Sequence, residues 1–234
     1  KITYNAMCAD ISSAYPYQLT KDMPTLHGCM FKKGRIKPTA DYPYAFYIKS
    51  HHIAIYKELD TRDFANYDYI YPSYNDTKAK WRPDDFINSK NEITVLCKKS
   101  EYSFKNIVEK LYNGRKKHPE YKDYLNMCTG YFAMNINPQL SPLLGVIRAR
   151  HAKLMFEYYI KLQLEGKSPL MIGTDAIIWT GGSSKYATDT KQLGSFTYVW
   201  KNAEVAIAGV KKYQVKNECG EVLTHWAGNA NGAN

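Results

Sequence analysis

The sequence contains few cysteines, and their spacing is not that of a metal site or a disulfide framework. The five are odd in number and scattered along 234 residues, without a CxxC pair or a Cys/His cluster. Thiols without a pairing pattern are typical of a reducing compartment, so we expect a cytoplasmic protein. The cysteines are Cys8, Cys29, Cys97, Cys128 and Cys219.

Long apolar runs and targeting segments are also lacking. No apolar stretch approaches the ~20 residues that a membrane-spanning helix needs, and no signal peptide is visible. We therefore expect no membrane partner. The sequence begins with Lys1 rather than methionine and reaches its first motif within ten residues, so we expect a fragment or processed piece of a longer protein.

Acidic residues are in the minority. The 32 lysines and arginines exceed the 22 aspartates and glutamates, which gives a formal net charge of +10. Such an excess favours a polyanionic partner such as nucleic acid, although a basic protein with no such partner is an alternative. The 21 tyrosines fit either reading, because tyrosine stacks on bases and also packs ordinary sheets.

The first stretch with chemical content is residues 9–19, ADISSAYPYQL. An apolar lead-in is followed by one carboxylate, Asp10, then by a polar turn and by Tyr15-Pro16. Proline disfavours helix at the preceding residue and cannot donate a strand hydrogen bond, so we predict that Asp10 closes a strand before a tight bend. A strand-end carboxylate that faces a bend with backbone amides suits a metal ion carrying phosphates.

Apolar periodicity and turn residues predict the order of the remaining elements. We expect a strand at 1–10, a short helix within 17–34, partly alternating strands at 44–59, loops with short strands at 60–91, a strand at 91–98, helices at 104–113 and 120–133, a connector at 135–142, a helix at 143–164, a hairpin at 168–181 and strands at 194–198, 205–215 and 221–226.

The second of the paired helices carries a regular polar pattern. Lys122 and Asn126 are four residues apart and therefore share a helix face, and Gly130 opens that face one turn further on. Arg115 and its basic neighbours precede this helix. Such a face can bind a nucleoside triphosphate, whereas the alternative is a solvated basic helix with a structural glycine.

Two later strings can also carry chemistry. Asp175 lies between two strongly apolar segments, where a carboxylate is costly to bury unless a cation or donor balances it; the alternative is an ordinary turn aspartate. In the segment AGVKKYQV, Lys211 and Tyr213 would share one face of a strand and could line a groove.

In this order the four strings resemble the motifs of family B DNA polymerases, most closely those of the protein-primed phage and plasmid type. Residues 10–16 resemble D-x-x-S-L-Y-P, and residues 122–130 resemble K-x-x-x-N-S-x-Y-G, with Met127 and Thr129 at two departures. Residues 173–176 resemble D-T-D-S, with Gly173 and Ala176 in place of the first aspartate and the serine. Residues 211–213 resemble K-x-Y.

The resemblance covers residues 8–215 and implies an α+β fold. It predicts a polymerase palm, an antiparallel sheet with helices on one face, into which a helical-hairpin fingers subdomain is inserted. The expected parts are a first palm segment at 1–100, the fingers at 101–134, a second palm segment at 135–228 and a disordered tail at 229–234.

The resemblance also implies a reaction and its site. The expected activity is template-directed nucleotidyl transfer to a primer 3′-hydroxyl with two Mg²⁺ ions, for which Mn²⁺ can substitute. Expected partners are primer–template DNA, deoxynucleoside triphosphates and a terminal or other replication protein, in the host cytoplasm if the chain is phage-encoded. Asp10 and Asp175 would be the catalytic residues. The metal ligands would be Asp10, Asp175 and the backbone of Ile11. The nucleotide would be bound by Ser12, Ser13, Ala14, Tyr15, Arg115, Lys122 and Asn126, with Tyr15 as a steric gate against a 2′-hydroxyl. The primer–template would be bound by Gly130, Thr174, Lys211, Lys212 and Tyr213.

The length of the sequence limits which polymerase parts we expect. Nine residues precede Asp10 and 21 follow Tyr213, so we expect a minimal or truncated enzyme without proofreading exonuclease or thumb, which would bind DNA weakly. One alternative is a catalytically degenerate, polymerase-like module that binds nucleic acid or replication partners. Another is a primase or template-independent nucleotidyltransferase. Retention of both Asp10 and Asp175 favours catalysis.

Overall fold

The computed structural model describes residues 3–50, 53–58, 69–72, 93–133, 141–209, 212–216 and 220–226, which form antiparallel sheets and helices. The α+β class predicted from the sequence is confirmed. The chain divides into two compact units, one of residues 1–17 with 151–234 and the other of residues 18–150. The boundaries of these units differ from those of the predicted palm and fingers segments, and the division into palm and fingers stays a prediction.

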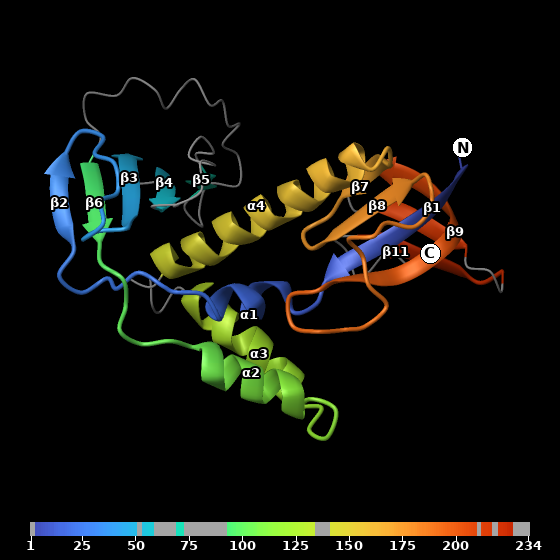
Figure 1. The fold of residues 1–234 in the computed structure, drawn as a ribbon, viewed down its shortest axis with the longest axis horizontal. Coiled ribbons are helices and arrows are strands. Elements are labelled where there is room, and N and C mark those ends of the chain that lie inside the picture. The colour runs from blue at the N-terminus through green and yellow to red at the C-terminus, as the bar shows by residue number, and fades with distance from the viewer. Residues whose placement is uncertain are drawn as a thin grey trace. The chain divides into compact units, whose positions relative to one another are not determined.

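The first unit is built on a six-stranded antiparallel sheet with the order β11-β10-β9-β1-β8-β7 (Figure 1). The first strand of the chain therefore lies inside the sheet, between β8 and β9, rather than at an edge. The strands are β1 (Thr3–Ile11), β7 (Ser168–Ile172), β8 (Ala176–Thr180), β9 (Phe196–Gly209), β10 (Lys212–Lys216) and β11 (Val222–Trp226).

Strand β1 is buried on both faces, which explains its apolar sequence. Because side chains alternate along a strand, Met7, Ala9 and Ile11 pack on one face with Trp179 and Phe196. Buried residues of the long helix α4 (Ser141–Leu164) pack in the same cluster. The other face of the sheet buries a second apolar cluster, to which Cys8 belongs.

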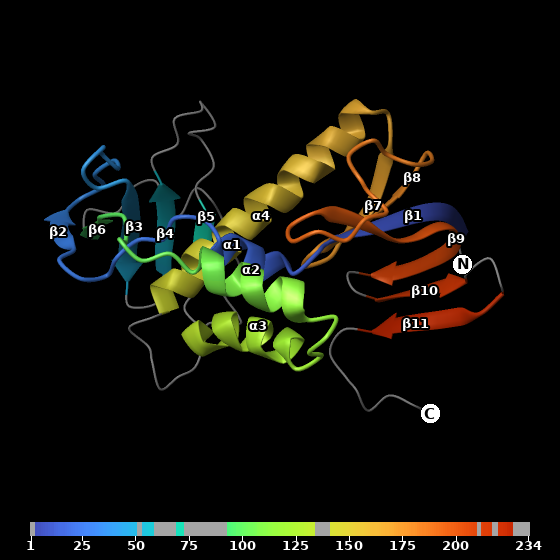
Figure 2. The same ribbon diagram turned by 60° about the horizontal axis from the view of Figure 1, so that its bottom comes forward.

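The predicted strands 194–198 and 205–215 are organised differently in the structure. Strand β9 is continuous from Phe196 to Gly209, and β10 is a separate strand after it (Figure 2). The interval at 199–204 also belongs to β9 and contains a bulge: Asn202 has a φ of 49°, and the register with β1 shifts between Ala6 and Cys8.

The second unit contains a five-stranded antiparallel sheet and a helical hairpin. The sheet order is β2-β6-β3-β4-β5. Its elements are β2 (Met30–Lys33), β3 (Tyr44–Ser50), β4 (Ile53–Glu58), β5 (Tyr69–Pro72), β6 (Ile93–Cys97), α2 (Lys105–Gly114), α3 (Tyr121–Gly130) and the 3₁₀ turn η2 (Tyr131–Ala133). The predicted pair of helices is confirmed, although the second ends as α-helix at Gly130. Among the described helices, none combines the length and apolarity that crossing a membrane requires.

The short helix α1 (Ala14–Leu19) begins earlier than the sequence predicts. Tyr15 precedes a proline and is nevertheless helical. Pro16 lies in the first turn, where backbone N–H groups have no intrahelical partner, so the missing donor costs nothing. The helix is entered through Ser13, whose φ is 51°, and the Tyr17 amide donates to the Ser13 carbonyl at 2.9 Å.

Gly194 fixes the loop before β9 against the segment that follows β1. Its amide donates to the Ser12 carbonyl at 2.9 Å, and its φ is 77°. A Cβ at this position would lie 2.3 Å from Cδ2 of Tyr17. Both the backbone conformation and the space therefore require glycine.

We expect Gly194→Ala to lower the free energy of unfolding by about 1–3 kcal/mol more than Gly220→Ala does. Gly220 is a matched control, because its φ of 83° imposes the same backbone strain while nothing lies within 4 Å of an added Cβ. Urea unfolding followed by tryptophan fluorescence measures both variants. Equal losses would contradict the packing of Gly194 against Tyr17.

Candidate active site

The antiparallel pairing of β1 with β8 brings Asp10 and Asp175 together. Asp10 lies opposite Ala176 in the register, and the amide of Ile11 donates to the carbonyl oxygen of Asp175 at 2.8 Å. Asp175 occupies the turn between β7 and β8 and is exposed. Two aspartates that are far apart in the sequence thus lie at the same end of neighbouring strands.

The environment of Asp10 disfavours its ionised form. Burial raises the pKa of Asp10 above its ordinary value, and the negative charge of Asp175 raises it further, whereas Lys191 lowers it. Oδ1 of Asp10 is buried and has no hydrogen-bond partner within the part of the chain that the structure describes. Burial thus outweighs the effect of Lys191, and one of the two carboxylate oxygens lacks a donor among the described residues.

The negative potential of the two aspartates extends to neighbouring groups. The pKa of the Cys8 thiol is raised to about 12, first by burial and then by Asp10 and Asp175. The pKa of Tyr213, in β10, is raised by burial and then by Cys8 and Asp175. The predicted primer-binding tyrosine therefore lies within electrostatic range of Asp175.

His151 also belongs to the site, although none of the sequence motifs includes it; it lies within the helix predicted at 143–164. Its Nε2 lies 2.6 Å from the carbonyl oxygen of Thr174, the neighbour of Asp175. Its ring meets the Tyr15 ring edge-on, with the centroids 5.3 Å apart. Burial lowers the pKa of His151, which favours the neutral imidazole. The signal in the sequence was a polar residue among apolar ones at helical spacing.

The segment predicted to cradle a triphosphate is partly occupied by internal hydrogen bonds. The Ile11 amide donates to Asp175, and the Ser12 amide donates to the Ser195 carbonyl at 2.9 Å. Neither amide is left for a phosphate. Ser12 and Ala14 are buried, and Tyr15 is half-buried. Nucleotide binding by Ser12, Ser13, Ala14 and Tyr15 stays a prediction, and it would use groups other than the Ser12 amide.

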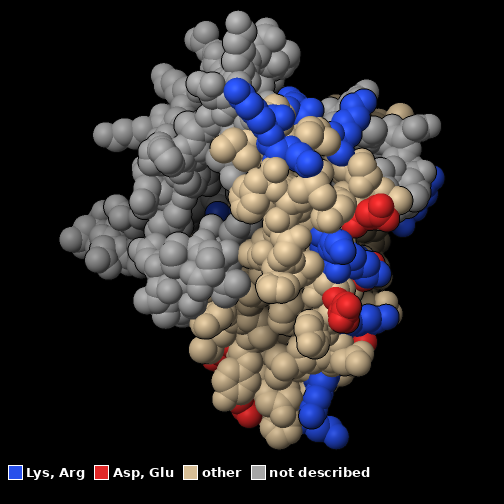
Figure 3. Space-filling view, turned by 90° about the vertical axis from the view of Figure 1, so that its left-hand side faces the viewer, with Lys and Arg blue, Asp and Glu red and all other residues tan. Residues whose placement is uncertain are grey.

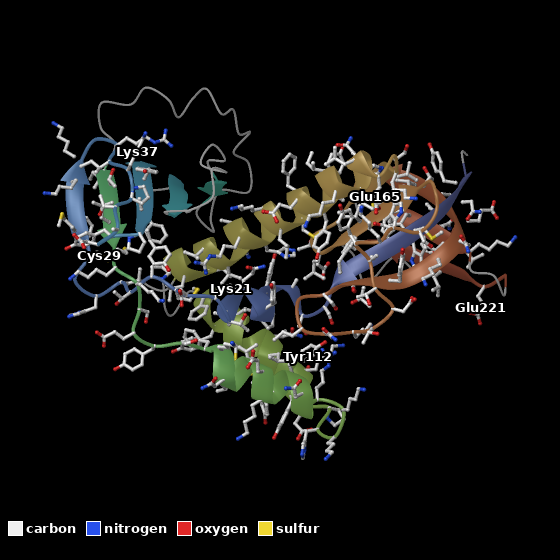
Figure 4. The ribbon with its side chains drawn as sticks, in the orientation of Figure 1. Lys21, Cys29, Lys37, Tyr112, Glu165 and Glu221 are labelled. Carbon is white, nitrogen blue, oxygen red and sulfur yellow. The ribbon has the colours of Figure 1, made fainter. Side chains whose placement is uncertain are left out.

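The predicted nucleotide-binding residues on the helical hairpin lie in the second unit. Lys122 and Asn126 are exposed one turn apart on α3, and Gly130 is the last residue of that helix. Arg115 lies over the ring of Tyr112, 3.6 Å from its centroid; Tyr112 is labelled on α2 in Figure 4. On the face drawn in Figure 3, Lys and Arg side chains gather at one end and elsewhere alternate with acidic ones.

The third predicted group is described only in part. Lys211 lies outside the described residues, so its relation to Tyr213 stays a prediction. Lys212 is the exposed first residue of β10, and Tyr213 is half-buried. Thr174 is exposed beside Asp175.

The donors at the carboxylate pair fit a hard divalent cation. Carboxylate and carbonyl oxygens are what Mg²⁺ prefers, and the unpartnered Oδ1 of Asp10 supplies one. Over the described ranges, no cluster of three or more His, Cys, Asp or Glu residues could hold a metal ion. A pair of carboxylates still suffices for Mg²⁺, which commonly takes one or two from the protein and the rest from substrate phosphates and water.

Comparison with solved structures identifies one fold. A structure titled as Phi29 DNA polymerase in an orthorhombic crystal form has a TM-score of 0.60 and 15% identity, covering 98% of this chain and 52% of that chain. The complex of that polymerase with primer–template DNA and incoming nucleotides has a TM-score of 0.63 and 14% identity, covering 98% and 51%. Its complex with single-stranded DNA has a TM-score of 0.61 at the same identity and coverage.

These similarities show a shared fold. The chain spans about half the length of the polymerase chains that it matches. No protein-family model and no curated protein matches the sequence.

We expect Asp10→Asn to be more stable than the unmodified protein at pH 7 in EDTA. The pKa of Asp10 is raised above its ordinary value of 3.8, so the folded state favours the protonated carboxyl. The stability that this contributes is complete below pH 3.8 and is lost as the pH rises through the raised pKa. The advantage of asparagine should therefore shrink as the pH falls towards 3.8. Urea unfolding between pH 3.5 and 8 measures it (roughly the range over which this linkage acts).

Asp189→Asn is the control for this experiment, because the Asp189 side chain is 73% exposed and should show no gain at pH 7. An Asp10→Asn variant less stable than the unmodified protein at pH 7 would contradict the account of Asp10.

Proposed function

We propose that this chain is a template-directed DNA polymerase of the family B type, which adds deoxynucleotides to a primer 3′-hydroxyl. The observation that carries the proposal is the placement of Asp10 and Asp175 at the same end of β1 and β8. The likeness to Phi29 DNA polymerase in fold supports it. The order of the four sequence motifs supports it independently.

Asp10, Asp175 and the Ile11 carbonyl would hold two Mg²⁺ ions, with Mn²⁺ as a substitute. When bound, the ions lower the pKa of the primer hydroxyl and balance the charge of the leaving pyrophosphate. Binding them also removes the repulsion between the two carboxylates. The raised pKa of Asp10 and its unpartnered Oδ1 are the features that favour cation binding here.

In the reaction the primer 3′-oxygen attacks the α-phosphorus of the nucleotide, and the bond to pyrophosphate breaks. Asp10 and Asp175 would position the reacting groups through the ions that they would hold. Tyr15, half-buried after the bend, would lie under the sugar and exclude a 2′-hydroxyl. Lys191 contributes a positive charge that acts on Asp10 and can neutralise phosphate.

DNA is the polyanionic partner that the charge favours. The net charge of +10 predicts binding that weakens steeply with salt, because each neutralised phosphate releases counterions. Structures of Phi29 DNA polymerase with primer–template DNA and with single-stranded DNA are among the similar folds. We propose primer–template DNA and deoxynucleoside triphosphates as the substrates.

A second candidate is a binding module of the same fold that has lost catalysis. Gly173 and Ala176 leave Asp175 as the only carboxylate of the β7–β8 turn. Nothing in the backbone requires this glycine, since a Cβ on Gly173 would meet the Ala176 carbonyl at an ordinary 3.5 Å. The loss of a carboxylate at this position is the observation that favours the second candidate.

We expect Asp175→Ala and Asp10→Ala each to lower nucleotide incorporation at least about a hundredfold, because metal-held carboxylates contribute several kcal/mol and 1.36 kcal/mol is a factor of ten. The assay is extension of a labelled primer on a template with Mg²⁺ or Mn²⁺. The exposed Asp189→Ala variant is the matched control and should extend normally. Equal incorporation by Asp175→Ala and the unmodified protein would end the enzyme proposal.

The same assay separates the related activities. Incorporation on an unprimed template would indicate a primase, and incorporation without template a template-independent nucleotidyltransferase. Salt-sensitive DNA binding with no incorporation would favour the binding module.

We expect Lys122→Ala to raise the KM for the nucleotide about tenfold with a smaller effect on kcat, because it would remove a charge-assisted hydrogen bond to phosphate. Steady-state extension kinetics measure both constants. Lys110→Ala is the control, because Lys110 is exposed on α2 of the same hairpin and outside the predicted site. Equal KM changes in the two variants would show that Lys122 contributes only general positive charge.

A further inference from the structure

His151 is 3% exposed and contacts two different parts of the proposed active site. Nε2 lies 2.6 Å from the Thr174 carbonyl oxygen. A carbonyl oxygen only accepts hydrogen bonds, so Nε2 carries the hydrogen and donates it. On the same imidazole, the ring meets Tyr15 edge-on at an interplanar angle of 85°.

The hydrogen bond to Thr174 holds the turn that presents Asp175. Within this turn, the Gly173 amide donates to the Ala176 carbonyl at 2.7 Å, and the Asp175 carbonyl accepts from Ile11. The side chains of Thr174 and Asp175 are exposed, so water competes for the polar groups of the turn. The Nε2 donor of His151 on α4 is buried, so water does not compete for its hydrogen bond to the Thr174 carbonyl.

Contact with Tyr15 fixes a second element. Tyr15 lies in the first turn of α1 and is half-buried. An edge-to-face contact between aromatic rings is directional, so the imidazole restricts the orientation of the Tyr15 ring. One side chain thus contacts the turn that bears Asp175 and the residue that would discriminate the sugar.

The second ring nitrogen shows that packing alone does not account for this histidine. Nδ1 is buried and has no hydrogen-bond partner in the described parts of the chain. An unpartnered buried polar atom costs free energy that an apolar side chain at the same position would avoid. The contribution of the imidazole therefore lies in its Nε2 donor and its ring edge.

We propose that His151 is a positioning residue that sets the Asp175 turn through Nε2 and the Tyr15 ring through its edge, and so joins ion binding to selection of the sugar. This rests on the proposed function. His151 touches neither substrate nor ion in this proposal and acts only through Thr174 and Tyr15.

Two substitutions separate the two contacts. His151→Gln keeps an N–H donor at the place of Nε2 and removes the ring, whereas His151→Phe keeps a ring and removes the donor. Leu162→Ala is the control for loss of stability, because Leu162 is a fully buried residue of the same helix. All assays are made well below the melting temperature of each variant.

Three measurements read out the proposal. The hydrogen-exchange rate of the Ile11 amide reports on the Asp175 turn without any ion. Mn²⁺ affinity, measured by electron paramagnetic resonance, reports on the carboxylate pair. The ratio of deoxynucleotide to ribonucleotide incorporation reports on Tyr15.

We expect His151→Phe to speed Ile11 exchange and weaken Mn²⁺ binding about fivefold, with the sugar ratio kept. We expect His151→Gln to keep exchange and Mn²⁺ affinity near the unmodified values and to lower the sugar ratio about fivefold.

The outcomes are distinguishable. Identical behaviour of the glutamine and phenylalanine variants, or the same changes in Leu162→Ala, would overturn the positioning role and leave His151 as an ordinary core residue. An unmodified protein that binds neither Mn²⁺ nor nucleotide would overturn the proposed function itself. If the unmodified protein binds Mn²⁺ and the His151→Phe variant shows the same exchange rate and Mn²⁺ affinity, the role of His151 alone is overturned.

Discussion

The pairing of β1 with β8 is the interaction on which the candidate site depends. One backbone hydrogen bond, from Ile11 to the Asp175 carbonyl, fixes the end of β1 against the turn that carries the second aspartate. The central position of β1, buried on both faces, makes this register costly to change. A shift by one residue would exchange the two faces of β1 and so disrupt the packing of both apolar clusters. The packing that stabilises the sheet therefore also fixes the carboxylate pair.

A cost in electrostatic energy accompanies this arrangement. Burial raises the pKa of Asp10, and its Oδ1 has no donor among the described residues. Both aspartates raise the pKa of Cys8, and Asp175 also raises that of Tyr213. Such a site is less stable in isolation than a neutral one would be. The cost is reduced when cations are bound, so the same feature that lowers stability favours the proposed chemistry.

The two sides of the site differ in how the structure holds them. Residues around the bend after β1 are fixed by internal hydrogen bonds from Ile11 and Ser12 and by the close fit of Gly194 against Tyr17. On the β7–β8 side, the exposed turn accepts hydrogen bonds from two buried residues, Ile11 of β1 and His151 of α4. A bend fixed by internal contacts, next to an exposed turn fixed on its buried side, suits a site that would receive and release a substrate.

Sequence by itself determined the α+β class, the helical hairpin and the candidate aspartates, because these follow from local periodicity and from short motifs. Tertiary structure decided the rest. Tyr15 is helical despite Pro16 because a first helical turn needs no amide there, and β9 is continuous because its bulge is set by pairing with β1. The hydrogen bonds of His151 and of the Ile11 and Ser12 amides are made to partners at least 23 residues away in the sequence. Contacts of that kind are made by packing, and no local pattern specifies them.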